Sequence, residues 1–291
     1  MIFGLTGNTR KESLWEPVIG LMAHFRETGT PFRLHADLAY GLAERGILQA
    51  DEAAALSATP LAECCDMVLS FGGDGTLLNT AAEIGDRGTP ILGVNIGRLG
   101  FLAHIEVSQV AAVIPRIAAG YYVIEPRMVL DAKAHGATLP QRWALNEVVI
   151  QREGEASLIA IEVLVDGVEV NTYWADGLII ATPTGSTAYS LAVGGPIVYP
   201  GSGTILLTPI APHTLTVRPM VLPDKVKIEA RVVDHDGPFV FTVDGRSTRL
   251  EDDDKRLTIK RAAHTVNIVR LPEQDFFSTL RTKLMWGARK S

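Results

Sequence analysis

The pattern of apolar residues changes near residue 105, and this change limits the folds open to the chain. Before it, helical patterns alternate with short apolar strand patterns: helices at 15–27, 38–45, 51–56 and 77–84, and strands at 2–5, 67–71 and 91–94. After it, a helical pattern at 111–119 precedes many consecutive strand patterns, with Asp-Gly turns at 166–167 and 244–245. Alternation is typical of a parallel sheet covered by helices, whereas consecutive strands favour an all-β domain. We therefore expect an α/β domain with a parallel sheet, followed by an all-β domain.

We place the domain boundaries at residues 105 and 265. The α/β domain then comprises residues 1–105, the all-β domain residues 106–265, and a tail residues 266–291. The tail is predicted to contain an amphipathic helix, because its apolar residues recur at helical spacing. These residues are Phe276, Phe277, Leu280 and Leu284.

The composition agrees with a soluble cytoplasmic protein. The 291 residues are 47% hydrophobic, which is ample for a core. The net charge of -6 disfavours nucleic acid or an anionic membrane as a main partner. The N-terminus lacks the charged segment and long apolar core of a secretion signal, and no apolar run reaches about 18 residues. We expect neither export nor membrane insertion.

The two cysteines, Cys64 and Cys65, are adjacent in the sequence. Neighbouring cysteines are too constrained to form an ordinary disulfide with each other, so a reducing compartment such as the cytoplasm is expected. Neither cysteine has the spaced histidine and cysteine partners of a zinc site. We expect both to be buried as small hydrophobic residues.

A glycine-rich turn at 72–76, with the sequence Gly-Gly-Asp-Gly-Thr, lies between an apolar strand and a helical pattern. A helix N-terminus after such a turn binds anions, because unpaired N–H groups and the positive end of the helix dipole converge there. The carboxylate of Asp74 would repel phosphate, so we expect it to take part in chemistry by holding a metal ion or accepting a proton. The alternative is a type I′ or type II turn without further function.

A second small-residue loop spans 176–196. The apolar residues 178–180 are predicted to form a buried strand that Pro183 and Gly185 end. The hydroxyls of Thr184, Ser186, Thr187 and Ser190 follow, without a basic side chain nearby. Such a loop can hold a neutral or phosphate-bearing ligand, and two such loops after buried strands favour nucleotide binding.

Two common nucleotide motifs are excluded by spacing. A Walker loop needs Lys-Ser or Lys-Thr after its last glycine, but Thr76 and Leu77 follow Gly75. A dinucleotide fingerprint needs a third glycine three residues after the second, but position 78 is leucine. The sequence supports neither a P-loop nor a hydride-transfer Rossmann site.

The chain resembles the bacterial NAD kinases along nearly its whole length. The resemblance rests on segments 72–76, 93–102, 125–128, 145–148, 176–196, 208–215 and 218–219. The first is shared with lipid kinases and phosphofructokinases. Asn146-Glu147 followed by the small-residue loop at 176–196, called the hydroxyl-rich loop below, is specific to NAD kinases. The resemblance implies transfer of the γ-phosphate of ATP to the 2′-hydroxyl of the adenosine ribose of NAD, giving NADP and ADP. It also implies that the tail helix returns to pack on the first domain.

The resemblance assigns roles to residues of the first loop. Asp74 would be the base that accepts the proton of the ribose 2′-hydroxyl. A placed carboxylate with a divalent ion suffices, because phosphoryl transfer needs mainly positioning and charge neutralisation. The phosphate pocket would be shaped by Gly72, Gly73, Gly75 and Thr76.

Further roles fall in the second domain. Asn146 and Glu147 match the pair that holds the substrate adenosine, where an amide can pair with adenine and a carboxylate can accept from ribose hydroxyls. Asp176 matches the aspartate that reaches the nicotinamide amide, commonly across a subunit interface. Six residues match the stretch that lines the dinucleotide: Thr187, Ala188, Tyr189, Ser190, Leu191 and Ala192.

Two residues depart from the family pattern. The family often has glutamine after the second Asp-Gly turn, where this chain has Arg246, so binding by that side chain is not carried over. Many members have serine where this chain has Ala192, so only a backbone contact is carried over there.

The resemblance also implies partners. These are NAD and ATP, with a divalent metal ion, Mg²⁺ or Mn²⁺, carried mainly by ATP because the sequence shows no histidine or cysteine cluster. A homo-oligomer is expected, either a dimer or a tetramer. One alternative is a diacylglycerol-type lipid kinase, which shares the 72–76 turn but leaves Asn146-Glu147 unexplained. The other is a catalytically silent nucleotide sensor, which would not need Asp74.

Overall fold

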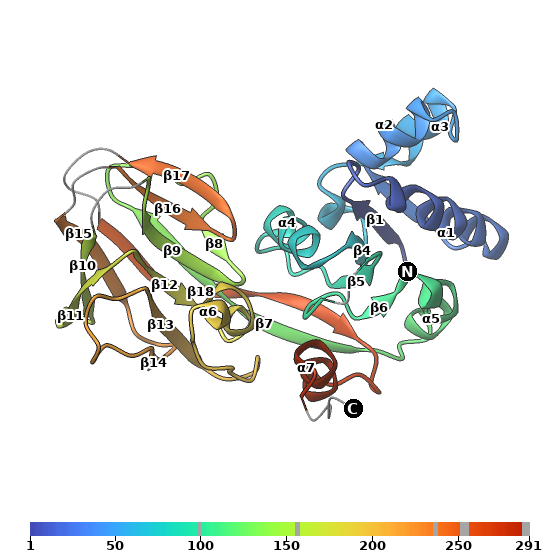
Figure 1. The fold of residues 1–291 in the computed structure, drawn as a ribbon. Coiled ribbons are helices and arrows are strands. Elements are labelled where there is room, and N and C mark those ends of the chain that lie inside the picture. The colour runs from blue at the N-terminus through green and yellow to red at the C-terminus, as the bar shows by residue number, and fades with distance from the viewer. Residues whose placement is uncertain (98–99, 155–157, 235–237, 251–255, 287–291) are drawn as a thin grey trace. The chain divides into compact units, whose positions relative to one another are not determined.

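The structure is a computed structural model that describes residues 1–97, 100–154, 158–234, 238–250 and 256–286 (Figure 1). The chain divides into two compact units, Met1–Pro126 with Val266–Ser291, and Arg127–Thr265. β7 (Val123–Ala134) and β18 (Arg256–Arg270) each run from one unit into the other. α5 (Val110–Ala118) belongs to the first unit, whereas the sequence-based boundary at residue 105 assigned it to the second.

The first unit contains a parallel sheet, as the alternating pattern predicted. Its strand order is β5-β4-β1-β2-β3. The end of β18 pairs with β5 on the other side. β4 lies between β5 and β1, and all six of its residues are buried, which explains its nearly continuous apolar sequence. The strands are β1 (Phe3–Gly7), β2 (Phe32–His35), β3 (Ser57–Ala58), β4 (Met67–Gly72), β5 (Ile91–Asn95) and β6 (Ile105–Glu106).

Helices cover this sheet through one hydrophobic core. Phe25 of α1 stacks on Phe3 of β1 with ring centroids 5.5 Å apart. α1 also contacts α5, whose apolar face joins the same core, and this packing places α5 in the first unit. The α-helices are α1 (Trp15–Thr28), α2 (Ala36–Glu44), α3 (Ala50–Leu56), α4 (Asp74–Ile84) and α5, and the short 3₁₀ helices are Glu12–Leu14, Leu61–Glu63 and Val107–Gln109.

The C-terminal tail forms α7 (Phe276–Leu284) and packs on the first unit, which confirms the expected return of this helix. Asp275 caps the helix by accepting the N–H of Ser278 at 2.9 Å. Just before the helix, Gln274 donates a side-chain hydrogen bond to the carbonyl of His104 at 3.0 Å. Leu280, on the apolar face of the helix, is buried.

The second unit is built of antiparallel strands, as the consecutive strand patterns predicted. One sheet has the order β14-β13-β12-β9-β16-β17, and a second contains β11-β10-β15-β18, with β7 paired to β8 and β18. Side chains of both sheets share one core, as in a β-sandwich. The strands are β8 (Trp143–Ala144), β9 (Glu147–Arg152), β10 (Ile159–Val165), β11 (Val168–Ala175), β12 (Gly177–Ala181), β13 (Thr204–Ile210), β14 (Met220–Pro223), β15 (Ile228–Asp234), β16 (Phe239–Val243) and β17 (Arg246–Leu250).

β12 is buried on both faces, and the face that points away from the shared core packs against the loop that follows. Ile179 and Ala181 form a small second core with Val193 and Val198, which lie in the loop after the strand. The loop contains the 3₁₀ helix Gly185–Thr187 and the short helix α6 (Tyr189–Ala192). Apolar contact with β12 therefore holds the hydroxyl-rich loop against the sheet.

Cys64 is exposed, so the expectation that both cysteines are buried is wrong for that residue. It lies at the end of the 3₁₀ helix Leu61–Glu63, where only Cys65 faces the interior, and the two sulfur atoms are 3.7 Å apart. None of the helices that the structure describes has both the length and the apolarity needed to cross a bilayer.

Candidate functional site

The turn at 72–76 has the predicted strand, turn and helix around it. β4 ends at Gly72, Gly73 is the N-cap, and α4 begins at Asp74. A Cβ atom at Gly72 would lie 2.2 Å from Oγ1 of Thr76, so the close approach of the turn to the first helical residues requires glycine. Asp74 therefore sits at the positive end of the α4 dipole.

The carboxylate of Asp74 is fixed by a second segment of the first unit. Oδ2 accepts the N–H of Phe101 at 2.8 Å, and Oδ1 accepts the N–H of Leu102 at 3.0 Å. A Cβ atom at Gly100 would lie only 1.9 Å from Oδ1, so the backbone passes closely over the carboxylate. A carboxylate has about four lone-pair sites, and each oxygen can therefore still accept a proton or contact a cation.

In the second unit, the hydroxyl-rich loop is built around the backbone of Asn146. Thr182 donates its N–H to the carbonyl of Asn146 at 2.8 Å and its hydroxyl to the carbonyl of Leu145 at 2.6 Å. A Cβ atom at Gly185 would lie 2.2 Å from the carbonyl oxygen of Asn146. Two segments that the sequence analysis assigned to one ligand are thus in direct contact.

Glu147 faces the same loop. Burial, and then the negative charge of Asp244, raise the pKa of Glu147 to about 8, while the backbone N–H of Tyr189 hydrogen-bonds to the carboxylate and opposes this shift. Its Oε2 atom is buried and has no hydrogen-bond partner among the described residues. A buried carboxylate oxygen without a donor is costly unless a ligand supplies one.

The next residues of the loop are Tyr189, whose backbone N–H reaches Glu147, and Ser190, which is held against the sheet. Ser190 is fully buried and shares a hydrogen bond of 2.8 Å with Thr208, so its hydroxyl braces the loop against β13. Of the predicted stretch, the structure thus brings the backbone of Tyr189 to Glu147. The stretch comprises Thr187, Ala188, Tyr189, Ser190, Leu191 and Ala192, at the end of the 3₁₀ helix and in α6.

Asp176 lies away from this cluster, at the other end of β12. Glu147 is opposite Ala181 in the sheet, whereas Asp176 precedes Gly177, and five residues of strand span roughly 16 Å. Oδ1 of Asp176 accepts the Nε hydrogen of Arg152 at 2.8 Å. No sequence motif surrounds Arg152, so this guanidinium could not be predicted as the partner of Asp176.

Asp244, which the sequence indicates only as part of a turn, contacts the candidate site. Its carboxylate accepts backbone N–H groups from the segment that carries Asn146 and Glu147. The only sequence signal was an Asp-Gly pair directly after a strand pattern, and that signal specifies a turn rather than a distant contact.

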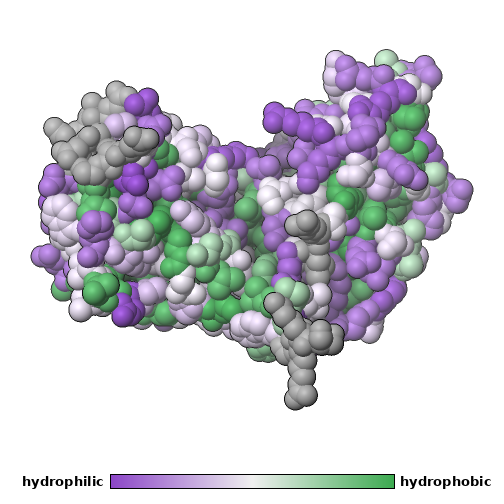
Figure 2. Space-filling model, viewed as in Figure 1, coloured by the Kyte–Doolittle hydropathy of each residue, from purple (hydrophilic) through white to green (hydrophobic). Residues whose placement is uncertain are grey.

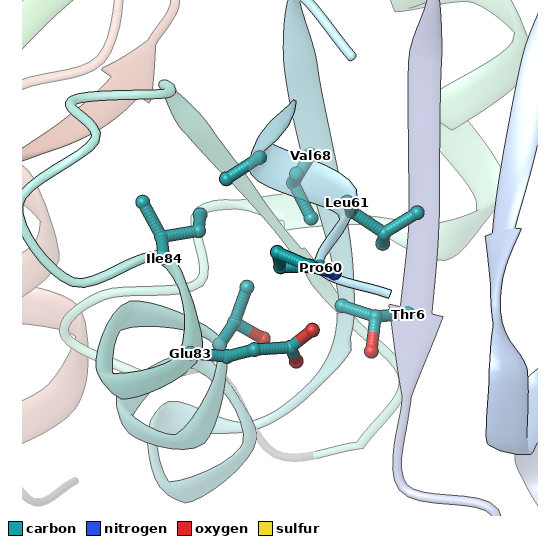
Figure 3. A pocket seen from close by; sticks show the side chains of 8 residues that line it. Thr6, Pro60, Leu61, Val68, Glu83 and Ile84 are labelled. Atoms are coloured by element: carbon teal, nitrogen blue, oxygen red, sulfur yellow. The ribbon is translucent and has the colours of Figure 1, made fainter. Parts of the chain in front are cut away.

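The predicted site residues therefore fall into two groups. Those of the 72–76 turn lie in the first unit, and Asn146, Glu147, Asp176 and the hydroxyl-rich loop lie in the second. A separate pocket in the first unit contains none of them and is lined by Thr6, Pro60, Leu61, Ala62, Val68, Thr80, Glu83 and Ile84 (Figure 3). There, Glu83 approaches His35, with Oε1 and Nε2 3.3 Å apart, and its hydrogen bond raises the pKa of His35.

Comparison with protein families gives two matches in this chain. The model described as the ATP-NAD kinase N-terminal domain matches residues 50–122, and the ATP-NAD kinase C-terminal domain matches residues 145–271. These ranges include the 72–76 turn, the Asn146-Glu147 pair and the hydroxyl-rich loop.

Individual relatives agree. An NAD kinase of Bacteroides fragilis is 46% identical over 224 residues, 77% of each chain, and one of Porphyromonas gingivalis is 38% identical over 290 residues, 97% of this chain and 96% of that one. Among solved structures, yeast NADH kinase in complex with NADH has a TM-score of 0.88 at 23% identity, covering all of this chain and 89% of that one. An NAD kinase of Archaeoglobus fulgidus in complex with ATP has a TM-score of 0.75 at 24% identity, covering 98% and 99%. Because both structures are less than 25% identical to this chain, the likeness shows the fold alone.

Proposed function

The chain belongs to the NAD kinase family, and we propose that it works through the two groups of residues described above. It transfers the γ-phosphate of ATP to the 2′-hydroxyl of the adenosine ribose of NAD, which gives NADP and ADP. The observation that carries the residue assignment is the contact between Asn146-Glu147 and the hydroxyl-rich loop. A lipid kinase needs neither of these segments.

Asp74 accepts the proton of the 2′-hydroxyl as the hydroxyl oxygen bonds to the γ-phosphorus of ATP and the bond from that phosphorus to the bridging oxygen breaks, so that ADP leaves. Its position supports this role, because two backbone N–H groups hold the carboxylate in one orientation and leave acceptor sites on each oxygen. The glycines around it allow backbone N–H groups to approach phosphate oxygens at the start of α4. Most of the catalytic effect then comes from placing the two substrates and neutralising their charge.

Asn146 and Glu147 hold the adenosine. The free Oε2 atom of Glu147 is suited to accept a hydrogen bond from a ribose hydroxyl, which would supply the donor that the oxygen lacks. The backbone of the loop from Thr187 to Ala192 lines the rest of the dinucleotide. Asp176 accepts from the nicotinamide amide, and its hydrogen bond from Arg152 orients the carboxylate for that role.

A direct assay tests the proposal. The purified protein should form NADP from NAD, ATP and Mg²⁺, detected by a dehydrogenase that accepts only NADP. Diacylglycerol in place of NAD should not be phosphorylated. Phosphorylation of the lipid without NADP formation would favour the lipid-kinase alternative, and nucleotide binding without turnover would favour the sensor.

A divalent ion, Mg²⁺ or Mn²⁺, completes the site and is carried mainly by the ATP phosphates. The free lone pairs of Asp74 provide hard oxygen donors of the kind these ions prefer. We expect protein treated with a chelator to lose activity and to regain it with Mg²⁺ or Mn²⁺ in the NADP assay. Recovery with Zn²⁺ alone would contradict this assignment.

We also propose a homo-oligomer, dimer or tetramer, that acts in the cytoplasm. β14 pairs only with β13 among the described strands, and its Met220 and Val221 are 37% and 48% exposed. Leu215, which precedes the strand, is 91% exposed. Hydrophobic residues reach the surface over β13 and β14 (Figure 2). An apolar edge strand readily pairs with or packs against a second chain.

In such an oligomer Asp176 would serve a dinucleotide whose adenosine is bound by another subunit. Asp74→Asn and Asp176→Ala proteins, each inactive alone, should then restore activity when their subunits are exchanged. For dimers mixed randomly in equal amounts, up to about a quarter of wild-type activity is expected, because one site in each mixed dimer is intact. A fully active monomer in sedimentation, or no recovery despite proven exchange, would refute the shared site but not the kinase activity.

A further inference from the structure

Asp244 links the second Asp-Gly turn to the adenosine-binding segment. Its Oδ2 accepts the N–H of Leu145 at 2.6 Å, and its Oδ1 accepts those of Asn146 at 2.9 Å and Glu147 at 3.0 Å. Its own N–H donates to the carbonyl of Glu147 at 3.1 Å. One residue thus makes four hydrogen bonds to a segment 97 to 99 positions earlier in the chain.

The strand pairing explains why this carboxylate is needed. β16 pairs with β9 as far as Val243 opposite Val148, and at Asp244 the chain turns away with φ of 44°. The backbone N–H groups of Leu145, Asn146 and Glu147 consequently have no strand to donate to on that side. Buried N–H groups without acceptors cost free energy, and the two oxygens of the Asp244 carboxylate accept from all three groups.

The opposite side of the same segment is held by the hydroxyl-rich loop. Thr182 binds the carbonyls of Leu145 and Asn146, and Gly185 lies against the carbonyl of Asn146. The segment is therefore held from both sides. Thr182 of the loop donates to the carbonyl groups of 145–146, and Asp244 accepts the N–H groups of 145–147.

We infer that Asp244 is a positioning residue for the kinase reaction, which fixes the backbone of 145–147 so that the Asn146 and Glu147 side chains meet the adenosine. Asp244 acts on NAD affinity through these residues and does not touch NAD itself. The inference rests on the proposed role of Asn146 and Glu147.

NAD affinity should therefore depend on the protonation state of Asp244. Burial raises the pKa of Asp244 to about 6, against the opposing effects of the three N–H groups and of Arg246. The ionisable groups beside it are Arg246 on β17, whose charge opposes the rise, and Glu147 on β9, whose own pKa of about 8 leaves its carboxyl uncharged near pH 6. As pH falls through about 6 the carboxyl gains a proton, and the protonated oxygen becomes a donor facing N–H donors. NAD affinity should therefore weaken below that pH.

Asp244→Asn tests the inference, because asparagine keeps the size and tolerates the turn but replaces one acceptor oxygen by a donor. Asp166→Asn is the matched control: Asp166 also precedes glycine, has φ of 50°, and exchanges two hydrogen bonds with the backbone of Lys227. Calorimetric titration with NAD should show affinity reduced roughly tenfold to a hundredfold by D244N. The control should stay within about twofold of wild type.

The pH profile separates positioning from a purely structural role. Wild-type affinity for NAD should fall through about pH 6, and D244N should lack that decline. A structural residue would instead change the melting temperature and leave the shape of the profile unaltered.

Unchanged NAD affinity in folded D244N, or an unchanged pH profile, would overturn the inference. Should D244N fail to fold, wild-type binding decides, since constant affinity across pH 6 also overturns it. A wild-type protein that binds NAD but forms no NADP would refute the proposed function instead.

Discussion

Replacing Asp74 with asparagine should lower kcat on the order of 10²–10⁴-fold while NAD still binds. The side chain keeps its size but can no longer take the proton of the 2′-hydroxyl. The NADP assay measures kcat, and calorimetric titration measures NAD binding separately. Near-normal turnover by the variant would remove Asp74 from the role of base.

The surroundings of Asp74 provide a second variant that leaves the carboxylate in place. A methyl group at Gly100 would lie 1.9 Å from Oδ1, so Gly100→Ala must push the carboxylate away from its two N–H donors. We expect a loss of kcat that approaches that of the asparagine variant, because general-base catalysis depends on position as well as on pKa. Gly100→Ala with full activity would show that the observed orientation of Asp74 is not the catalytic one.

Gly185→Ala should unfold the second unit more easily and weaken NAD binding. The added Cβ atom would meet the carbonyl oxygen of Asn146 at 2.2 Å, and backbone atoms cannot rotate away as a side chain can. A cost of about 1–3 kcal/mol in the free energy of unfolding is expected, as for other overpacked sites. Denaturant titration measures this cost.

The matched control is Gly20→Ala, an exposed position on α1 where an added Cβ atom meets nothing within 4 Å. Alanine favours a helix over glycine by up to about 1 kcal/mol, so this variant should be more stable than wild type. The two substitutions should therefore have opposite signs. A harmless Gly185→Ala would mean that the loop does not lie against Asn146 as described.

Much of this protein could be predicted from sequence because the signals are local. Apolar periodicity located the strands and helices on both sides of the 72–76 turn, the many strands of the second unit, and the tail helix. The Asp-Gly pairs fixed two tight turns, with positive φ at Asp166 and Asp244. Periodicity does not show which elements pack together. It predicted α5 as a helix but not the packing of α5 against α1, which places α5 in the first unit.

The amino-acid sequence by itself determined the family, since the order Gly-Gly-Asp-Gly-Thr, Asn-Glu and the hydroxyl-rich loop is specific to it, and it predicted which residues carry the chemistry. Only the tertiary structure decided how those residues are held. The Asp74 carboxylate meets N–H groups 27 and 28 positions later, and Asp244 meets N–H groups 97 to 99 positions earlier. Such contacts depend on strand register and on where a partner strand ends, and neither leaves a periodic signal in the residues concerned.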